Sequence, residues 1–302
     1  MRPLSRWLAG ALAASSAAGA AQAHVMGPAE AAAPPGWTWD LSVTAPLALA
    51  LALFGAGWLR LRARSRRGGG KLERRALLFI AGWSSLALAL VSPLHQAGER
   101  AFSAHMAEHE TMMLLAAPLL VLSGPLAIML WAFPAPARVA LGRIGQARAA
   151  AAAWRAITRP VTATLVQAAA LWAWHAPALF DLALGDPAWH VVQHLCFLVS
   201  ALLFWTAMLQ PGRGDKGVAV LCLFATSVVS GALGALMAFS ESPWYAAYAQ
   251  LGVQPFGLTP AEDQQVAGLL MWIPGGLVHI GAALALIGSV LRAGIGRAAD
   301  AR

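Results

Sequence analysis

The sequence predicts an all-α polytopic membrane protein, a bundle of about seven transmembrane helices that follows an N-terminal signal peptide. Three observations lead to this fold class. The 302 residues are 59% apolar and only 11% charged, a composition outside the range of soluble domains. Apolar stretches of about 20 residues, long enough to span the hydrocarbon core of a bilayer, recur along the chain. The basic residues fall almost entirely in alternate loops between these stretches.

The chain divides into a leader, a short outer segment, a membrane domain and a tail. Residues 1–23 combine a basic start, an apolar stretch and a small-residue pattern at Ala21–Ala23, which is typical of a secretory signal peptide. Residues 24–40 form a short periplasmic segment, residues 41–292 the membrane domain and residues 293–302 a cytoplasmic tail. The seven predicted spans are residues 41–61, 75–92, 109–133, 161–180, 190–209, 217–239 and 266–291.

The basic residues predict the orientation of these spans. Lys and Arg gather in the first, third and fifth loops and in the tail, and Arg100 is the only basic residue on the other side after the signal region. Loops rich in Lys and Arg stay in the cytoplasm, so we expect the N-terminus outside and the C-terminus inside. Basic inner loops also meet anionic lipid headgroups, and this explains the net charge of +8 without nucleic-acid binding.

Two segments between the spans have a composition of their own. Residues 134–159 are rich in Ala and Arg, which favours an amphipathic helix on the inner surface. Residues 240–265 form the longest outer loop, and we interpret its aromatic residues as an interfacial belt.

The eight histidines supply the functional signal. None lies in a predicted cytoplasmic loop; seven lie at or near the outer face, and His279 lies inside the last span. His105 and His109 are four residues apart, as are His190 and His194 in a different span. That spacing places two imidazoles on one helix face, where both can bind one metal ion. Two such pairs at one membrane depth predict a metal site between facing helices.

Other residues extend this predicted site. His95 and His175 lie near the same face, and Met112 and Met113 follow His109 by about one helical turn. Thioethers suit Cu(I), and imidazole suits copper, zinc and iron. If cleavage follows Ala23, His24 becomes the N-terminus and offers an amine and an imidazole together.

The last predicted span contains an ionisable residue beside a helix breaker. His279 follows the Pro274-Gly275-Gly276 run, which we expect to interrupt the helix and to line a deeper pocket. The span enters through Glu262-Asp263-Gln264-Gln265, a polar group that we expect to support the histidines.

The two cysteines do not point to redox or metal chemistry. Cys196 and Cys222 lie at different predicted depths, so we expect no disulfide between them. No nucleophile–base pair, phosphate loop or nucleotide fingerprint is evident, so we do not expect an enzyme.

Five runs of the sequence together resemble the CtaG family of cytochrome c oxidase assembly factors, the multi-span form associated with caa-type oxidases. They are SPLHQAGERAFSAHMAEHETMMLLAAPLLVL (92–122), WAWHAPALFDLAL (172–184), WHVVQHLCFLVSALLFW (189–205), SPWYAAYA (242–249) and EDQQVAGLLMWIPGGLVHI (262–280). The resemblance covers roughly residues 40–292. It implies a bacterial inner-membrane protein that matures haem-copper oxidase by helping to deliver copper. The family's histidine motifs match His95, His105, His109, His175, His190, His194 and His279.

We therefore expect an oxidase assembly factor that binds copper, with Cu(I) favoured. In this hypothesis His105, His109, His190 and His194 form the primary site, assisted by Met112 or Met113, and His279 lines the deeper pocket that passes the metal on. The expected partners are oxidase subunits, periplasmic copper chaperones and membrane lipid. Two alternatives stay open: a redox protein whose histidines bind b-type haem, and a metal-free assembly scaffold.

Overall fold

The computed structural model describes residues 34–64, 69–210, 216–251 and 257–300, and every regular element within these ranges is a helix. This agrees with the predicted fold class. The predicted signal peptide and His24 lie outside the described residues. The predicted tail is for the most part a continuation of the last helix, which runs to Asp300.

Five helices in the described ranges are long and apolar enough to cross a membrane. They are α3 (Leu41–Arg64), α4 (Gly69–Val91), α13 (Pro187–Leu209), α14 (Lys216–Ala238) and α16 (Pro260–Asp300), whose apolar part ends at Arg292. A bent pair, residues 102–123 and 125–132, passes the same test as one broken span. The helix expected from residues 161–180, α11 (Pro160–Trp174), has only 15 residues and is followed by α12 (Pro177–Gly185). The count of seven therefore stays a prediction.

The third predicted span is a chain of short helices. It runs through α6 (Phe102–Glu110), the π-helix η1 (Thr111–Ala116), α7 (Ala117–Ser123), α8 (Pro125–Met129) and the 3₁₀ turn η2 (Leu130–Ala132). The chain bends by 48° at Gly124, whose φ of +57° is a left-handed conformation that glycine adopts readily. Arg75 of α4 donates to the carbonyls of Ser123 and Gly124 at 2.7 and 2.8 Å. The bend therefore has its exposed carbonyls satisfied from a neighbouring helix.

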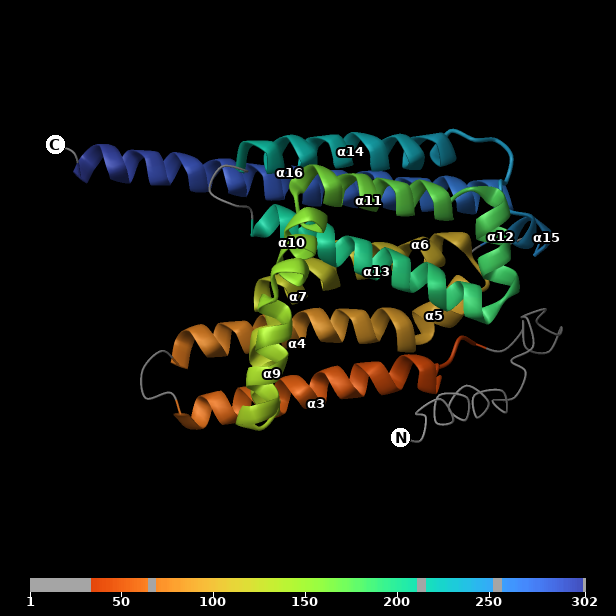
Figure 1. Cartoon of the computed structure of the whole chain (residues 1–302). Helices are drawn as coiled ribbons and strands as arrows, with labels where there is room; N and C mark the ends of the chain where they lie inside the picture. The colour runs from red at the N-terminus through yellow and green to blue at the C-terminus, as the bar shows by residue number, and fades with distance from the viewer. Residues whose placement is uncertain (1–33, 65–68, 211–215, 252–256, 301–302) are drawn as a thin grey trace, which may run out of the picture.

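The long helices lie side by side, with α3 and α4 at one edge of the bundle and α14 and α16 at the other (Figure 1). Two helices, α9 (Ala135–Gln146) and α10 (Arg148–Ile157), run across one end. They replace the single amphipathic helix expected over residues 134–159. At the opposite end lie α5 (Pro93–Gly98), α12 and α15 (Ala246–Gln250). We call this the α5 end, because the histidines of α5, α6 and α13 gather there.

The expected interruption of the last span is wrong. α16 continues through Pro274, Gly275 and Gly276 as one helix. An internal proline removes one backbone hydrogen bond, which the flanking turns of a long helix tolerate when neighbouring helices pack around it. A Cβ atom on Gly275 would lie 3.9 Å from Oε2 of Glu110, and one on Gly276 would lie 3.8 Å from Oγ of Ser227. Both distances are ordinary van der Waals contacts, so a Cβ atom would fit at either position, and neither glycine breaks the helix.

Glycines also set the contact between α14 and α16. A Cβ atom on Gly268 would lie 2.4 Å from the carbonyl oxygen of Gly234 and 2.6 Å from the backbone nitrogen of Ala238. Real Cβ atoms do not approach backbone atoms so closely, so the two helices touch main chain to main chain. Small residues at such crossings are typical of membrane helix packing.

We predict that Gly268→Val forces α14 and α16 apart and lowers the free energy of unfolding by about 1–3 kcal/mol, the usual cost of overpacking. Gly281→Val is the matched control, because nothing lies within 4 Å of a Cβ atom there on the same helix. Thermal unfolding in detergent measures both variants. Equal midpoints for the two would contradict the assigned packing.

Candidate metal centre

The helices that carry the histidines begin at defined caps. Asp186 starts α13 by accepting hydrogen bonds from the backbone nitrogens of Ala188 and Trp189 at 2.8 and 3.2 Å, and Pro187 occupies the first turn. Ser92 caps α5 in the same way, by accepting from the backbone nitrogen of Leu94. These caps place His190, His194 and His95 within a few residues of a helix start.

The start of α6 is capped by a residue from the other end of the chain. Asp263 of α16 is fully buried and accepts from the backbone nitrogens of Phe102 and Ser103 at 2.6 and 3.2 Å. The Ser103 hydroxyl also donates to it, at 2.5 Å. A carboxylate at a helix N-terminus is stabilised by unpaired N–H groups and by the helix dipole. Asp263 therefore holds α6, with His105 and His109, against α16.

Five imidazole rings meet at the α5 end. His105 and His109 on α6 have ring centroids 4.3 Å apart, and so do His190 and His194 on α13. The two helices face each other, since His109 lies 5.0 Å from His194 and His105 lies 5.4 Å from His190. His95 on α5 stacks on His190 at 5.6 Å with an interplanar angle of 11°. The predicted meeting of the two histidine pairs is therefore present in the structure.

Three of these histidines form a group that could hold a metal ion. One ring nitrogen from each of His105, His109 and His194 lies within 4.8 Å of those of the other two. His105 and His109 are each 1% exposed. Nε2 of His105, both ring nitrogens of His109 and Nε2 of His194 are enclosed and have no hydrogen-bond partner. Buried polar atoms are nearly always paired, so this set of lone donors is typical of a site for an ion.

Glu108 lies among these rings, and the sequence reasoning did not select it. Its side chain is fully buried, and its Oε1 lies 2.9 Å from Nδ1 of His95 and 3.8 Å from Nε2 of His194. Burial acts to lower the pKa of His95, but the hydrogen bond and the negative charge of Glu108 outweigh it and raise this pKa above its ordinary value. The available signal was spacing, because Glu108 is three residues after His105 and so shares its helix face.

Aromatic side chains close the α5 end over the cluster. Phe102, Phe180, Tyr245 and Tyr248 contact one another, with ring centroids 4.0 to 6.4 Å apart. The Tyr248 hydroxyl donates to the carbonyl of Gly98 at 2.6 Å, and burial raises the pKa of Tyr248, so it stays a donor. The expected interfacial belt is wrong for both tyrosines, which are 1% and 4% exposed and pack inside the protein.

His175 lies next to the cluster, and its ring contacts a backbone carbonyl and two phenylalanines. Its Nδ1 donates to the carbonyl of Leu171 at 2.6 Å, so its Nε2 carries the lone pair. That Nε2 is buried and has no hydrogen-bond partner. The ring packs against Phe180 and Phe197, at 6.0 and 5.8 Å, and Phe197 also contacts His109.

Contrary to expectation, the polar run that opens α16 bonds mainly with backbone groups, and it supports the histidines through the cap on α6. Asp263 caps α6, as described above. Gln264 accepts from the backbone nitrogen of Trp244 and donates to the carbonyl of Ser242, and Gln265 donates to the carbonyl of Ser240. Glu262 bonds with Thr259. A polar residue at a helix start satisfies the nearest backbone groups first, and here these belong to α6 and to the loop after α14.

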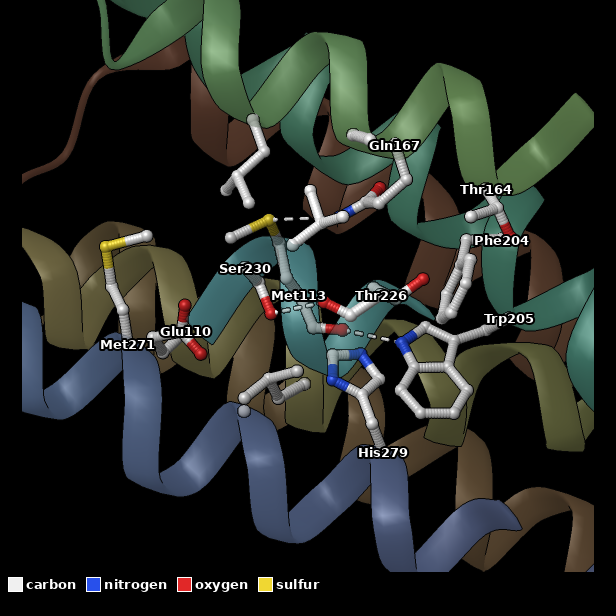
Figure 2. A pocket seen from close by; sticks show the side chains of 15 residues that line it. Glu110, Met113, Thr164, Gln167, Phe204, Trp205, Thr226, Ser230, Met271 and His279 are labelled. Carbon is white, nitrogen blue, oxygen red and sulfur yellow. Dashed lines mark hydrogen bonds between the residues drawn. The ribbon is translucent and has the colours of Figure 1, made fainter. Parts of the chain in front are cut away.

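A separate small cavity of about 40 Å³ lies deeper in the bundle, between α6–η1, α11, α13, α14 and α16. His279 and Met113 both line it, together with Glu110 and Gln167 (Figure 2). The expected pocket around His279 therefore exists, although Pro274 does not line it. Met113 lies here and not among the five imidazoles, because the π-helical turn after Glu110 changes the helix phase.

The remaining candidate residues pack in the hydrophobic core or against it. Met112 is fully buried within the hydrophobic core. Cys196 and Cys222 are both free, as expected, and Cys196 packs against the core.

Comparison with known proteins adds one family and two relatives. Residues 52–293 match the sequence profile of a family described as "Cytochrome c oxidase caa3 assembly factor". The chain is also 26% identical over 248 residues to "Uncharacterized protein Mb0105" of Mycobacterium bovis and to "Uncharacterized protein MT0111" of Mycobacterium tuberculosis. Each match covers 78% of this chain and spans 36% of the relative's length. No solved structure matches the chain.

We predict that Asp263→Ala lowers the free energy of unfolding by about 1–3 kcal/mol, because it leaves buried N–H groups of α6 without an acceptor. Glu241→Ala is the control, because it removes an exposed carboxylate from the segment between α14 and α15. Thermal unfolding in detergent measures the difference. An unchanged midpoint for Asp263→Ala would show that α6 is not held by this residue.

Proposed function

The chain belongs to the cytochrome c oxidase caa3 assembly factor family, and on this premise we propose that it holds copper as cargo at His105, His109 and His194. The observation that carries the proposal is the convergence of three buried imidazoles whose ring nitrogens lie within 4.8 Å of one another. Free donors on two facing helices give an ion a ready site, because no existing hydrogen bond has to break when it binds.

The donor set fits a small metal ion. Two nitrogens bound to one tetrahedral ion at about 2.0–2.1 Å lie roughly 3.3 Å apart, so the three rings reach a metal after a modest closure. Imidazole donors suit copper as well as zinc. Membership in an oxidase assembly family favours copper, which haem-copper oxidases contain, and the oxidase is then the partner that receives it.

His95, His190 and Glu108 have roles at the edge of this site. The side chains of His95 and His194 are 16% and 12% exposed, whereas those of His105 and His109 are almost completely enclosed. Copper therefore enters from the side of His95 and His194 and settles between α6 and α13. Glu108 orients His95 through Nδ1 and adds one negative charge beside the bound cation.

The orientation that the basic residues predict places the α5 end on the periplasmic side of the inner membrane. The Arg-bearing helices α9 and α10 lie across the opposite end of the bundle (Figure 1). With this topology the histidines face the compartment in which periplasmic copper chaperones would supply the ion, and α9 and α10 meet the inner lipid surface.

Haem is the second candidate ligand, and the ring packing does not favour it. A haem bound by two histidines requires a porphyrin plane between its axial ligands. The five imidazoles contact each other directly, with centroid distances of 4.3 to 6.2 Å. A Soret band in the purified protein would favour haem, whereas an absence of any metal after copper(I) loading would favour a scaffold.

We predict that His105→Ala combined with His109→Ala removes copper from this site without removing the protein from the membrane. Mass spectrometry of metal content, on protein loaded anaerobically with copper(I), is the measurement, together with the copper content of the oxidase. Thr111→Val, which removes a hydroxyl one helical turn beyond Ala107, is the control on the same stretch of chain. Normal oxidase copper in the double variant would defeat the proposal.

We predict that Glu108→Gln lowers the affinity for copper by about 10- to 100-fold, because it removes a negative charge 3.8 Å from the ligand nitrogen Nε2 of His194. Glutamine keeps an acceptor for His95 Nδ1 and removes only the charge. Competition with a copper(I) chelator measures the affinity, and an affinity equal to that of the parent would remove Glu108 from the site.

A further inference from the structure

The deeper cavity holds polar groups that nothing in the described structure satisfies. Oε2 of Glu110, Oε1 of Gln167, and the hydroxyl oxygens of Thr164 and Thr226 are enclosed and lack a hydrogen-bond partner. All four residues line the same space. So many unpaired polar atoms around one space are unusual in a protein interior, where such atoms are satisfied by water, an ion or another polar ligand.

The lining also carries donors for a soft cation. Met113 is 4% exposed and His279 is 5% exposed, and both reach into the cavity, as does Glu110 (Figure 2). Thioether sulfur selects Cu(I) over hard cations, and imidazole suits copper in general. A cation that displaces the proton of Glu110 gains the negative charge that it needs inside the membrane.

Neighbouring groups fix the positions of these donors. Trp205 donates from Nε1 to the carbonyl of Met113 at 2.8 Å and stacks on the His279 ring at 5.7 Å with an interplanar angle of 13°. Gln167 donates to the sulfur of Met113 at 3.6 Å. These contacts fix the backbone of Met113 and the ring of His279 beside one tryptophan, within one cavity.

The cavity continues the α6–η1 segment inward from the histidine cluster. Glu110 follows His109 directly, and Met113 lies four residues beyond His109, about 6 Å further along the helix axis. Met271 also lines the cavity, but it is eight residues before His279 on α16, about 12 Å away along that helix. Met271 and His279 therefore cannot bind the same ion, and Met271 lies on the side nearer to the histidines.

We propose that this cavity is a second Cu(I) site, formed by the sulfur of Met113, the imidazole of His279 and the carboxylate of Glu110. The proposal rests on the proposed copper-holding function and deepens it: the ion passes inward from His105, His109 and His194 to a sulfur-containing site within the bundle. The transfer exchanges ligands around one Cu(I) ion and involves no change of oxidation state.

The test is copper stoichiometry combined with X-ray absorption at the copper edge, on full-length protein in detergent loaded anaerobically with copper(I). The parent should bind two equivalents per chain. The His105→Ala/His109→Ala variant should keep one, with sulfur in its coordination shell. Met113→Leu combined with His279→Gln should also keep one, with nitrogen ligands only. Ser230→Ala, which lines the cavity but donates its hydroxyl to Thr226 of its own helix, should bind as the parent does.

The outcomes separate the two sites. One equivalent in the parent, bound by nitrogen alone and lost in the His105→Ala/His109→Ala variant, overturns the second site and leaves the outer one intact. One equivalent with sulfur ligands that survives in that variant overturns the outer site and supports the inner one. Leucine replaces methionine at nearly constant volume, so the Met113→Leu single variant also removes the sulfur signal with little disturbance of packing.

Discussion

The hydrogen bonds that Asp263 accepts from the start of α6 position this helix, and with it the histidine cluster and one wall of the deeper cavity. They join α16 to α6 across 160 residues of sequence and set the depth and rotation of α6. From that start the chain places His105, Glu108 and His109 on the face toward α13, and then Glu110 and Met113 on the cavity deeper in the bundle. A carboxylate buried inside a membrane protein needs such donors, because no water is there to solvate it.

The π-helical turn is the second determinant of this arrangement. A regular α-helix would continue the face of His109 through Met112 and Met113. The wider turn at Thr111–Ala116 rotates the residues that follow it, so the imidazoles lie on one face of the segment and the thioether of Met113 lies on another. Wide turns of this kind are rare and are frequent at functional positions.

The sequence predicted the parts of this structure that depend on composition and local spacing. Apolar length located the membrane helices, and the four-residue spacing of His105–His109 and His190–His194 predicted two pairs that meet across helices. The family resemblance is confirmed.

The errors in the sequence predictions share a physical cause, namely partners that are distant in sequence. Asp263 and the tyrosines of residues 245–248 were assigned by their neighbours along the chain, whereas their real partners are α6, Gly98 and His175. Glu108 could have been found from its spacing to His105, whereas the π-helical turn at η1 is not evident from composition or spacing.

The long-range cap also imposes an order on biosynthesis. α6 leaves the ribosome well before α13, and α16, which carries Asp263, is made later still. Until α16 is inserted, the first N–H groups of α6 lack their acceptor, and until α13 is inserted the histidines of α6 lack their counterparts. The histidine cluster therefore assembles only after both α13 and α16 have been inserted. A nascent or truncated chain that lacks these helices has the histidines of α6 without the groups that face them.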